Sequence, residues 1–130
     1  MTRINLGIEP AELCDQHLVA EYRELPRIFN FAAKTPAPEH FKLGSGHVKW
    51  CAKYLGTMKD RQISIVEEMK RREFTVNFSD VPTVNDNDLY CSGFEVITAR
   101  ALLQERINER LNGMKRISWT KTKKPDWVRS

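Results

Sequence analysis

The sequence has little of what marks a membrane, secreted or metal-binding protein. Its 130 residues hold no apolar run long enough to span a bilayer, and the first residues are polar and charged where a secretory segment would be apolar. The three cysteines, Cys14, Cys51 and Cys91, form an odd, widely spaced set without a C-x-x-C pair. We therefore expect reduced thiols packed in the core of an intracellular protein, with no disulfide framework, no metal site and no cofactor.

Internal repeats, low-complexity tracts and abrupt shifts of composition are also absent. With 41% hydrophobic residues, a chain of this length can bury one core, so we expect a single domain over residues 1–130. Apolar residues recur at helical spacing over residues 10–33, 47–72 and 93–111. The sequence thus predicts an all-α fold of three main helices, followed by an irregular basic tail over residues 113–130.

Proline and glycine positions add detail to this prediction. Pro26 lies inside the first helix, where it removes one backbone hydrogen bond, so we expect a kink there. Asn112-Gly113 predicts a left-handed stop at the end of the third helix. Residues 34–46 and 79–88 are expected to be loops, and the alternation over 74–78 predicts a short extended segment.

The net charge of +4 is concentrated at the C-terminal end. Residues 114–130 carry six cations against the single Asp126, and the rest of the chain sums to −1. Trp119 and Trp127 lie among these cations, a composition that meets phosphates with charge and unstacked bases with aromatic faces. The tail therefore indicates nucleic-acid binding, and the alternative is a solvated, disordered tail that keeps the protein soluble.

The N-terminus offers a nucleophile of its own. Met1 precedes the small Thr2 and is expected to be removed, which exposes a free α-amine on Thr2. An α-amine has a reference pKa of about 7.7–8.0 against about 10.4 for lysine, so a larger fraction is neutral and nucleophilic at pH 7. Because amines of this kind form imines with carbonyl-like carbons, Thr2 is a candidate for covalent catalysis.

Helix spacing gathers charged side chains on one flank of the first helix. At 100° per residue, His17 and Glu24 lie about 20° apart, and Arg23 and Arg27 lie about 40° apart. The two arginines therefore form a ridge beside the carboxylate. The alternative is a surface ion-pair ladder such as Glu24 with Arg27, which is worth roughly a few tenths of a kcal/mol.

Five short stretches of the sequence carry a resemblance to a known family. They are Thr-Arg-Ile-Asn-Leu at 2–6, Asp-Gln-His-Leu at 15–18, Ala-Glu-Tyr-Arg-Glu-Leu-Pro-Arg at 20–27, Leu-Gly-Ser-Gly-His-Val at 43–48 and Lys-Asp-Arg-Gln-Ile at 59–63. With these stretches the chain resembles the pyrimidine-dimer DNA glycosylases with abasic-site lyase activity, the phage-type endonuclease V family. The similarity is collinear through Arg72.

The resemblance implies a small all-helical DNA-repair enzyme whose N-terminal segment packs between the helices. Its partner would be double-stranded DNA containing damaged pyrimidines or abasic sites, and it would act as a monomer, away from membranes. The N-terminal amine would displace a damaged base at the sugar C1′ as an imine, and β-elimination would then cut the strand. No metal is needed for imine chemistry.

The resemblance also assigns roles to residues. Thr2 matches the nucleophile, acting through its α-amine, and Glu24 matches the essential carboxylate. It places Arg3, Arg23, Arg27 and Arg106 at phosphates and His17 near the substrate. The composition of the basic tail adds Lys121 and Trp127 as expected DNA-binding residues. For His17, a histidine satisfied inside the helix packing is the alternative.

Three departures from the family pattern affect lesion choice more than chemistry. The loop at 34–43 is much shorter, Leu102 stands where the family has an arginine, and the tail after Trp119 lacks the family's tyrosine cluster. Two alternatives therefore stay open. One is a non-catalytic nucleic-acid-binding module, and the other is an abasic-site lyase with altered lesion specificity.

Overall fold

The computed structural model describes residues 4–30, 39–43, 47–77, 83 and 85–129. Regular structure within them is helical throughout, without a strand, which confirms the all-α prediction. The elements are a 3-10 helix η1 (Pro10–Glu12) and the α-helices α1 (Asp15–Phe29), α2 (His47–Lys53), α3 (Leu55–Arg71) and α4 (Gly93–Asn112).

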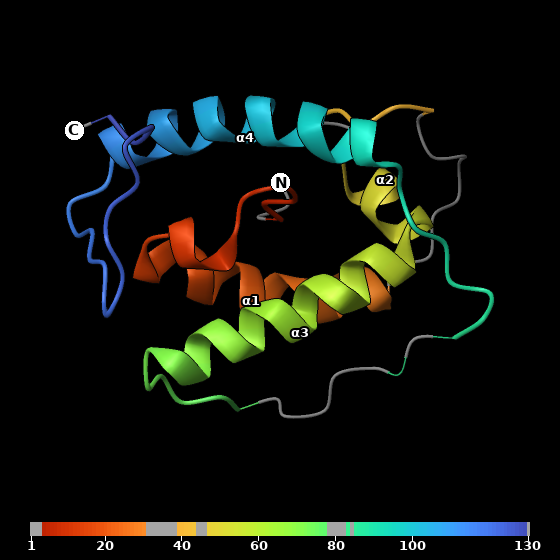
Figure 1. Ribbon diagram of the computed structural model, residues 1–130, viewed down its shortest axis with the longest axis horizontal. Coiled ribbons are helices and arrows are strands. Elements are labelled where there is room, and N and C mark those ends of the chain that lie inside the picture. Colours follow the sequence, from red (N-terminus) through yellow and green to blue (C-terminus); the bar gives the residue numbers. More distant parts are fainter. Residues whose placement is uncertain (1–3, 31–38, 44–46, 78–82, 84, 130) are drawn as a thin grey trace.

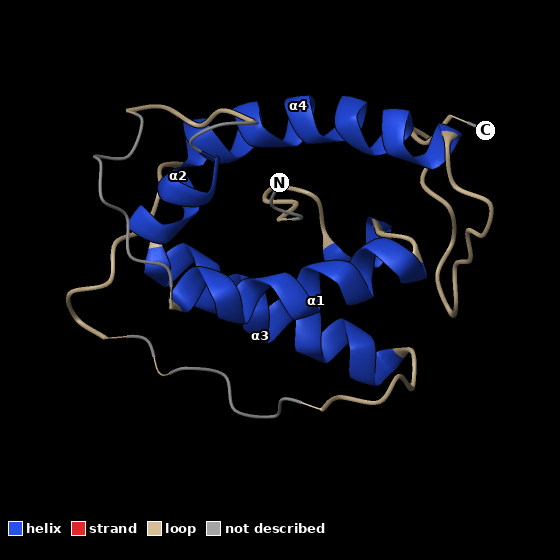
Figure 2. Cartoon of the chain, turned by 180° about the vertical axis from the view of Figure 1, so that it is seen from behind, coloured by secondary structure: helices blue, strands red, loops and turns tan. Residues whose placement is uncertain are grey.

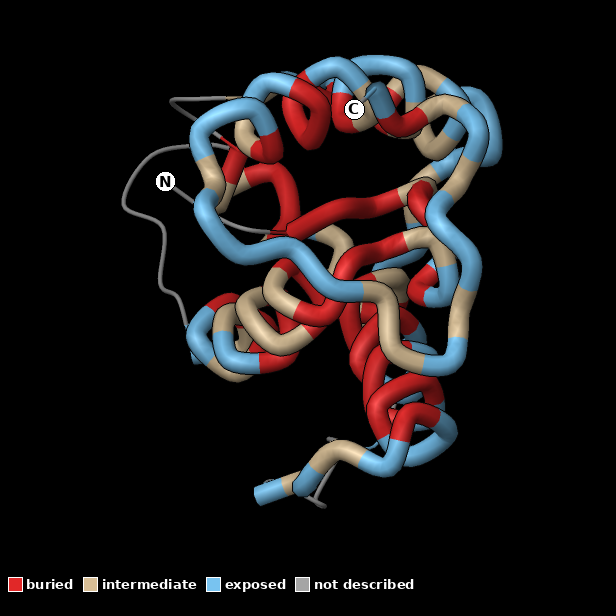
Figure 3. The backbone as a smooth tube through the Cα atoms, turned by 90° about the vertical axis from the view of Figure 1, so that its left-hand side faces the viewer, coloured by how far each residue is buried: buried red, intermediate tan, exposed pale blue. Residues whose placement is uncertain are grey.

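The helices form two layers with the N-terminal segment between them. Helices α1 and α3 pack side by side in one layer, and α4 runs across the other, with the short α2 joining them at one end (Figures 1 and 2). Residues 4–8 pass through the space between the layers, where Ile4, Leu6 and Ile8 are buried (Figure 3). Burial of these side chains removes apolar surface from water and fixes the segment against both layers. The expected packing of the N-terminal segment between the helices is confirmed.

The first helix is shorter than predicted. The expected helix over 10–33 is interrupted because Leu13 and Cys14 are extended, with ψ of 140° and 162°. The Asp15 backbone N–H then donates to the Ser118 carbonyl at 2.8 Å, so the tail satisfies one of the free donors of the first turn. The helix continues through Pro26, and the kink expected there stays a prediction.

The second predicted helix is two helices, which corrects the expectation of one helix over 47–72. Tyr54 leaves helical geometry, with φ −107° and ψ 62°, and separates α2 from α3. The N–H of Gly56 donates to the Leu89 carbonyl at 2.9 Å. A Cβ at Gly56 would lie 2.6 Å from a ring atom of Tyr90, so only glycine lets the 89–90 segment approach this closely.

The left-handed helix stop occurs at a different place from the one predicted. Gly113 has φ −95°, and its N–H closes a tight turn onto the Arg110 carbonyl, so the prediction at the end of α4 is wrong. Glu73, with φ 65°, instead follows α3. Its N–H donates to the Lys70 carbonyl and that of Phe74 to the Met69 carbonyl, which is the Schellman arrangement. The chain turns away here, and residues 74–77 form no strand. The short extended segment expected over 74–78 stays a prediction, because residue 78 lies outside the described residues.

The basic tail is irregular, as predicted, and it is attached to the body of the protein. Ser118 and Thr120 donate their hydroxyls to the Asp15 carboxylate at 2.7 and 2.6 Å. The Thr122 hydroxyl donates to the Ala11 carbonyl at 2.7 Å, and Val128 is buried. These contacts order residues 118–128 along η1 and the start of α1, which a solvated, disordered tail would not show.

Candidate active site on helix α1

Helix α1 carries the predicted charged cluster. His17, Arg23, Glu24 and Arg27 all lie within Asp15–Phe29, so the expected spacing holds: His17 lies near Glu24 around the helix, and Arg23 and Arg27 form the ridge beside the carboxylate. Exposure to solvent increases from His17 to Arg27: His17 is buried, the Glu24 side chain is 16% exposed, and the Arg27 side chain is 81% exposed. Arg23 is exposed and borders an open groove on α1. The flank thus presents cations to solvent with a half-buried carboxylate beside them.

Glu24 is loosely held. Within the described part of the chain its ion-pair partner is Arg27, with Nη1 3.7 Å from Oε2, and no hydrogen bond holds the carboxylate there. This is the pair that the ion-pair alternative expected. With Arg27 so exposed, solvent screens the attraction, and such a pair contributes roughly 0.2–1 kcal/mol at most. As far as the described residues go, most of the acceptor capacity of the Glu24 carboxylate is unused.

Glu21, one turn earlier on α1, is held tightly. It is 0% exposed and accepts hydrogen bonds from Arg61 Nε at 2.7 Å, Arg61 Nη2 at 3.1 Å and Asn5 Nδ2 at 3.1 Å. Arg61 Nη1 donates to the Ile8 carbonyl. The Glu21–Arg61 pair thus joins α1 and α3 to two points of the N-terminal segment, Asn5 through the carboxylate and Ile8 through the guanidinium.

A second ion pair holds the other side of the N-terminal segment. Arg100 of α4 forms a bidentate pair with Glu12, at 2.6 and 2.8 Å, and also donates to the Gly7 carbonyl at 3.0 Å. The hydrogen bonds from Arg100 lower the pKa of the Glu12 carboxyl to about 2, although burial alone would raise it. The Trp127 indole N–H donates to the same carboxylate at 3.1 Å. Glu12 therefore links α4, the N-terminal segment and the tail.

Asp15 joins the tail to the end of α3. Burial by itself raises the pKa of its carboxyl, but hydrogen bonds from Thr120 and Ser118 outweigh this and hold the pKa below its usual value. Arg72, fully buried, donates to Asp15 Oδ1 at 2.9 Å and to Glu68 Oε2 at 2.8 Å. A buried carboxylate with this many donors stays ionised and fixes the geometry around it.

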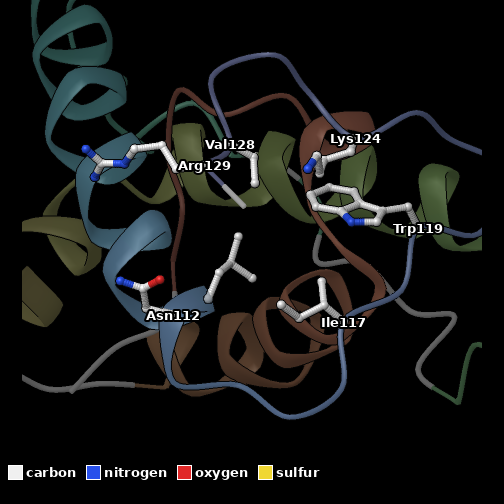
Figure 4. Close-up of a pocket in the computed structure, with 7 residues that line it drawn as sticks. Asn112, Ile117, Trp119, Lys124, Val128 and Arg129 are labelled. Atoms are coloured by element: carbon white, nitrogen blue, oxygen red, sulfur yellow. The ribbon is translucent and has the colours of Figure 1, made fainter.

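Two of the predicted DNA-binding residues belong to this attached tail. Lys121 forms an ion pair with Glu73, with Nζ 2.6 Å from Oε2, and its side chain is half exposed. Trp127 is partly buried, and the side-chain amide of Asn108 donates to the Trp127 backbone carbonyl at 3.1 Å. The tail also encloses a cavity of about 260 Å³ against the end of α4. Figure 4 shows Ile117, Trp119 and Val128 turned toward this space; its full lining is Leu111, Asn112, Ile117, Trp119, Lys124, Val128 and Arg129.

Arg106, the predicted phosphate contact of α4, is nearly buried. It and Arg110 act electrostatically on His47, a histidine at the start of α2 that is 1% exposed. Burial, followed by these two cations, lowers the pKa of His47 to about 4. The imidazole is therefore neutral at pH 7, and it packs edge-on against the Phe41 ring at a centroid distance of 5.2 Å.

Thr2 and Arg3 lie outside the described residues, so the predicted nucleophile is not placed here. None of the helices in the described ranges is long and apolar enough to cross a membrane. In the same part of the chain, no group of three or more His, Cys, Asp or Glu side chains is arranged to hold a metal ion.

A family model described as pyrimidine dimer DNA glycosylase matches residues 1–81. The chain belongs to this family. The match spans more than half of the chain and includes Glu24, Glu21 and Arg61, so the α1 flank and the buried network beside it both lie in the family region. The protein is thus a DNA glycosylase, and its substrate is DNA that contains damaged pyrimidines.

Sequence reasoning missed the residues of the buried network. Asn5, Glu21 and Arg61 lie within the stretches that carry the resemblance, but the sequence pattern assigns them no role. One signal was available: Glu21 lies at the helical position next to Leu18, Tyr22 and Leu25, which face the core. A charged residue in the inward phase of a helix needs a buried partner of opposite charge.

Proposed function

We propose that this glycosylase acts through the N-terminal α-amine of Thr2 and that it also cuts the strand as an abasic-site lyase. The amine attacks C1′ of the damaged nucleotide as the glycosidic C–N bond breaks and the base leaves with a proton. Loss of a proton from nitrogen and opening of the sugar ring give an imine. Removal of a C2′ proton then breaks the C3′–O bond, the phosphate leaves, and water hydrolyses the imine to free the enzyme.

The state of Glu24 is the observation that carries the proposal. A half-buried carboxylate without a hydrogen bond in the described residues is suited to two tasks: stabilising a cationic sugar or imine, and accepting the C2′ proton. Glu21, saturated with donors, could do neither without losing its partners. The carboxylate predicted from the resemblance is therefore the one that is available for chemistry.

Chain connectivity supports a role for the amine. Asn5 is hydrogen-bonded to Glu21, and Thr2 is three residues away along the chain. Three extended residues span at most about 10 Å, so the amine is tethered within that radius of Asn5, whose side chain contacts the α1 turn that bears Glu24. This tether limits the volume that the amine can occupy and so raises its effective concentration near the Glu24 carboxylate.

The DNA contacts of this proposal are cationic. Arg23 and Arg27, exposed on α1, are positioned to hold phosphates beside the lesion, and guanidinium binds phosphate in a bidentate way. Arg3, His17, Arg106, Lys121 and Trp127 are proposed as further contacts.

Borohydride trapping tests the nucleophile. Hydride reduces the imine to a stable amine, so the enzyme should become covalently attached to DNA and the adduct should map to the Thr2 α-nitrogen. Thr2→Ser should retain trapping, whereas retention of Met1 or acetylation of the N-terminus should abolish it. Mapping of the adduct to a lysine would refute the assignment.

A lyase with altered lesion choice is the second candidate. The family match ends at residue 81, so the tail that forms the cavity of Figure 4 lies beyond it. Trapping should be compared on matched duplexes with an abasic site or a pyrimidine dimer. Trapping on abasic DNA alone would favour the lyase, and binding without trapping on either duplex would favour a non-catalytic module.

A further inference from the structure

We propose that Glu21 and Arg61 are positioning residues that hold the N-terminal segment, through Asn5 and Ile8, so that the terminal amine meets Glu24. The inference rests on the proposed role of Thr2. It assigns a function to a buried ion pair that touches neither the DNA nor the reacting atoms.

The first argument concerns the hydrogen bonds of the Glu21–Arg61 pair. The Glu21 carboxylate accepts from both Arg61 and Asn5, and the remaining Arg61 nitrogen donates to the Ile8 carbonyl. One guanidinium and one carboxylate thus fix the side chain of Asn5 and the backbone of Ile8. Both anchors lie in the segment that leads directly to Thr2.

The second argument is energetic. A buried ion pair loses about as much hydration as it gains in attraction, and apolar residues of similar volume would hold α1 against α3 as well or better. Contacts between apolar side chains, however, are not directional, so an apolar pair could not fix the position of a neighbouring backbone. A bidentate, hydrogen-bonded pair at 0% exposure for Glu21 does fix it. Orientation of the segment is therefore the property that these charges add.

The third argument is the position of the pair relative to Glu24. Glu21 and Glu24 are three residues apart on α1, so their Cβ atoms are about 5–6 Å apart, as neighbours on a helix surface. The carboxylate that anchors the segment and the carboxylate proposed for catalysis thus share one turn. Any displacement of the anchor changes the distance between the amine and Glu24.

The opposite side of the segment is equally constrained. Gly7 has φ 89°, and a Cβ there would lie 2.7 Å from the Val96 carbonyl of α4. Arg100 donates to the Gly7 carbonyl from the same helix. Since α4 blocks movement in that direction, loss of the Glu21–Arg61 pair would release the segment on one side only, as a shift and not as general unfolding.

The test compares two substitutions on α3. Arg61→Met removes the pair and keeps much of the side-chain volume. Lys59→Met is the matched control, because Lys59 is also ion-paired, to Asp88 at 2.8 Å, and both cationic side chains are 8% exposed. We would measure three properties of both variants: the rate of single-turnover borohydride trapping at saturating abasic DNA, the affinity for DNA, and the thermal stability. The trapping rate of Arg61→Met should fall by about 100-fold, the effect of a displacement near 1 Å, with DNA affinity unchanged. Lys59→Met should trap at the wild-type rate.

Two further variants keep the inference testable if Arg61→Met does not fold. Asn5→Ala removes a single anchor and should also slow trapping at unchanged affinity. Arg61→Lys keeps the charge but loses the planar guanidinium that bonds Glu21 and Ile8 together, so its trapping rate should lie between those of Arg61→Met and the wild type. Equal rates in the wild type and Asn5→Ala, or equal losses in Arg61→Met and Lys59→Met, would overturn the positioning role while wild-type trapping upholds the proposed function. Absence of wild-type trapping would overturn both.

Discussion

Acidification provides a quantitative test of the packing around His47. Its pKa is about 4 in the folded protein, against about 6.5 in an unfolded chain. Between these values the unfolded chain binds more protons than the folded one, so the free energy of unfolding falls as the pH is lowered. The stabilisation is complete above pH 6.5 and is lost progressively down to pH 4. For one group with these two pKa values, the loss between pH 7 and pH 5 is about 2 kcal/mol.

The comparison with His47→Gln isolates this effect. Urea unfolding of the wild type and the variant at pH 7 and pH 5 gives four free energies, and the wild type should lose about 2 kcal/mol more than the variant on acidification. The carboxyls of Glu12, Asp15 and Glu68 have lowered pKa values as well, but they titrate mainly below this window and are common to both proteins.

Parallel losses in the two proteins would refute the reasoning. They would mean that His47 is protonated or hydrated in the folded protein, in contradiction to its 1% exposure and to the absence of hydrogen-bond partners for its ring nitrogens among the described residues. A smaller loss in the wild type than in the variant would indicate an anionic partner near the imidazole, with the opposite sign of linkage.

Three further predictions concern DNA. Glu24→Gln should bind damaged duplex as the parent does and lose strand cleavage by about 10²–10⁴-fold, the range for a positioned acid or base; loss of affinity at an unchanged single-turnover rate would contradict this. Combined Lys123→Gln and Lys124→Gln should flatten the slope of log K against log salt by up to about 1.8, measured by titration on intact duplex. Trp127→Ala should leave that slope nearly unchanged but lower the preference for damaged duplex by about 1–3 kcal/mol if the indole stacks on a base.

The helices were predictable where local patterns decide them, and their interruptions were not. Apolar spacing located α1, α3 and α4, because a helix face must be buried whatever it packs against. The breaks before Asp15 and at Tyr54 accompany hydrogen bonds from the Asp15 and Gly56 N–H groups to the carbonyls of Ser118 and Leu89, which lie far away in the sequence. A local pattern carries no information about such partners. The stop at Glu73 was missed for a different reason: its hydrogen bonds are local, but the left-handed position holds a glutamate and not the glycine that marks such stops in a sequence.

The candidate site shows the same division. Helical geometry placed Glu24 beside Arg23 and Arg27 correctly, because all of them lie on α1. Geometry within one helix could not show that Glu21 is saturated by Arg61 and Asn5 while Glu24 keeps its acceptors, because these partners come from α3 and the N-terminal segment. Two glutamates three residues apart thus differ in their hydrogen bonding through tertiary contacts alone.

The contacts of η1 and the start of α1 connect the chemistry to the tail. Glu12 holds Arg100 and Trp127, so the residue that ties the N-terminal segment to α4 also receives the tail's indole. Asp15, at the first position of α1, accepts a hydrogen bond from the Thr120 hydroxyl. The family match ends at residue 81, yet the tail beyond it is hydrogen-bonded to the elements that flank the proposed nucleophile. We therefore expect a change at Trp127 to reach the N-terminal segment through Glu12. In the proposed mechanism, the tail and the imine-forming amine thus depend on the same carboxylate.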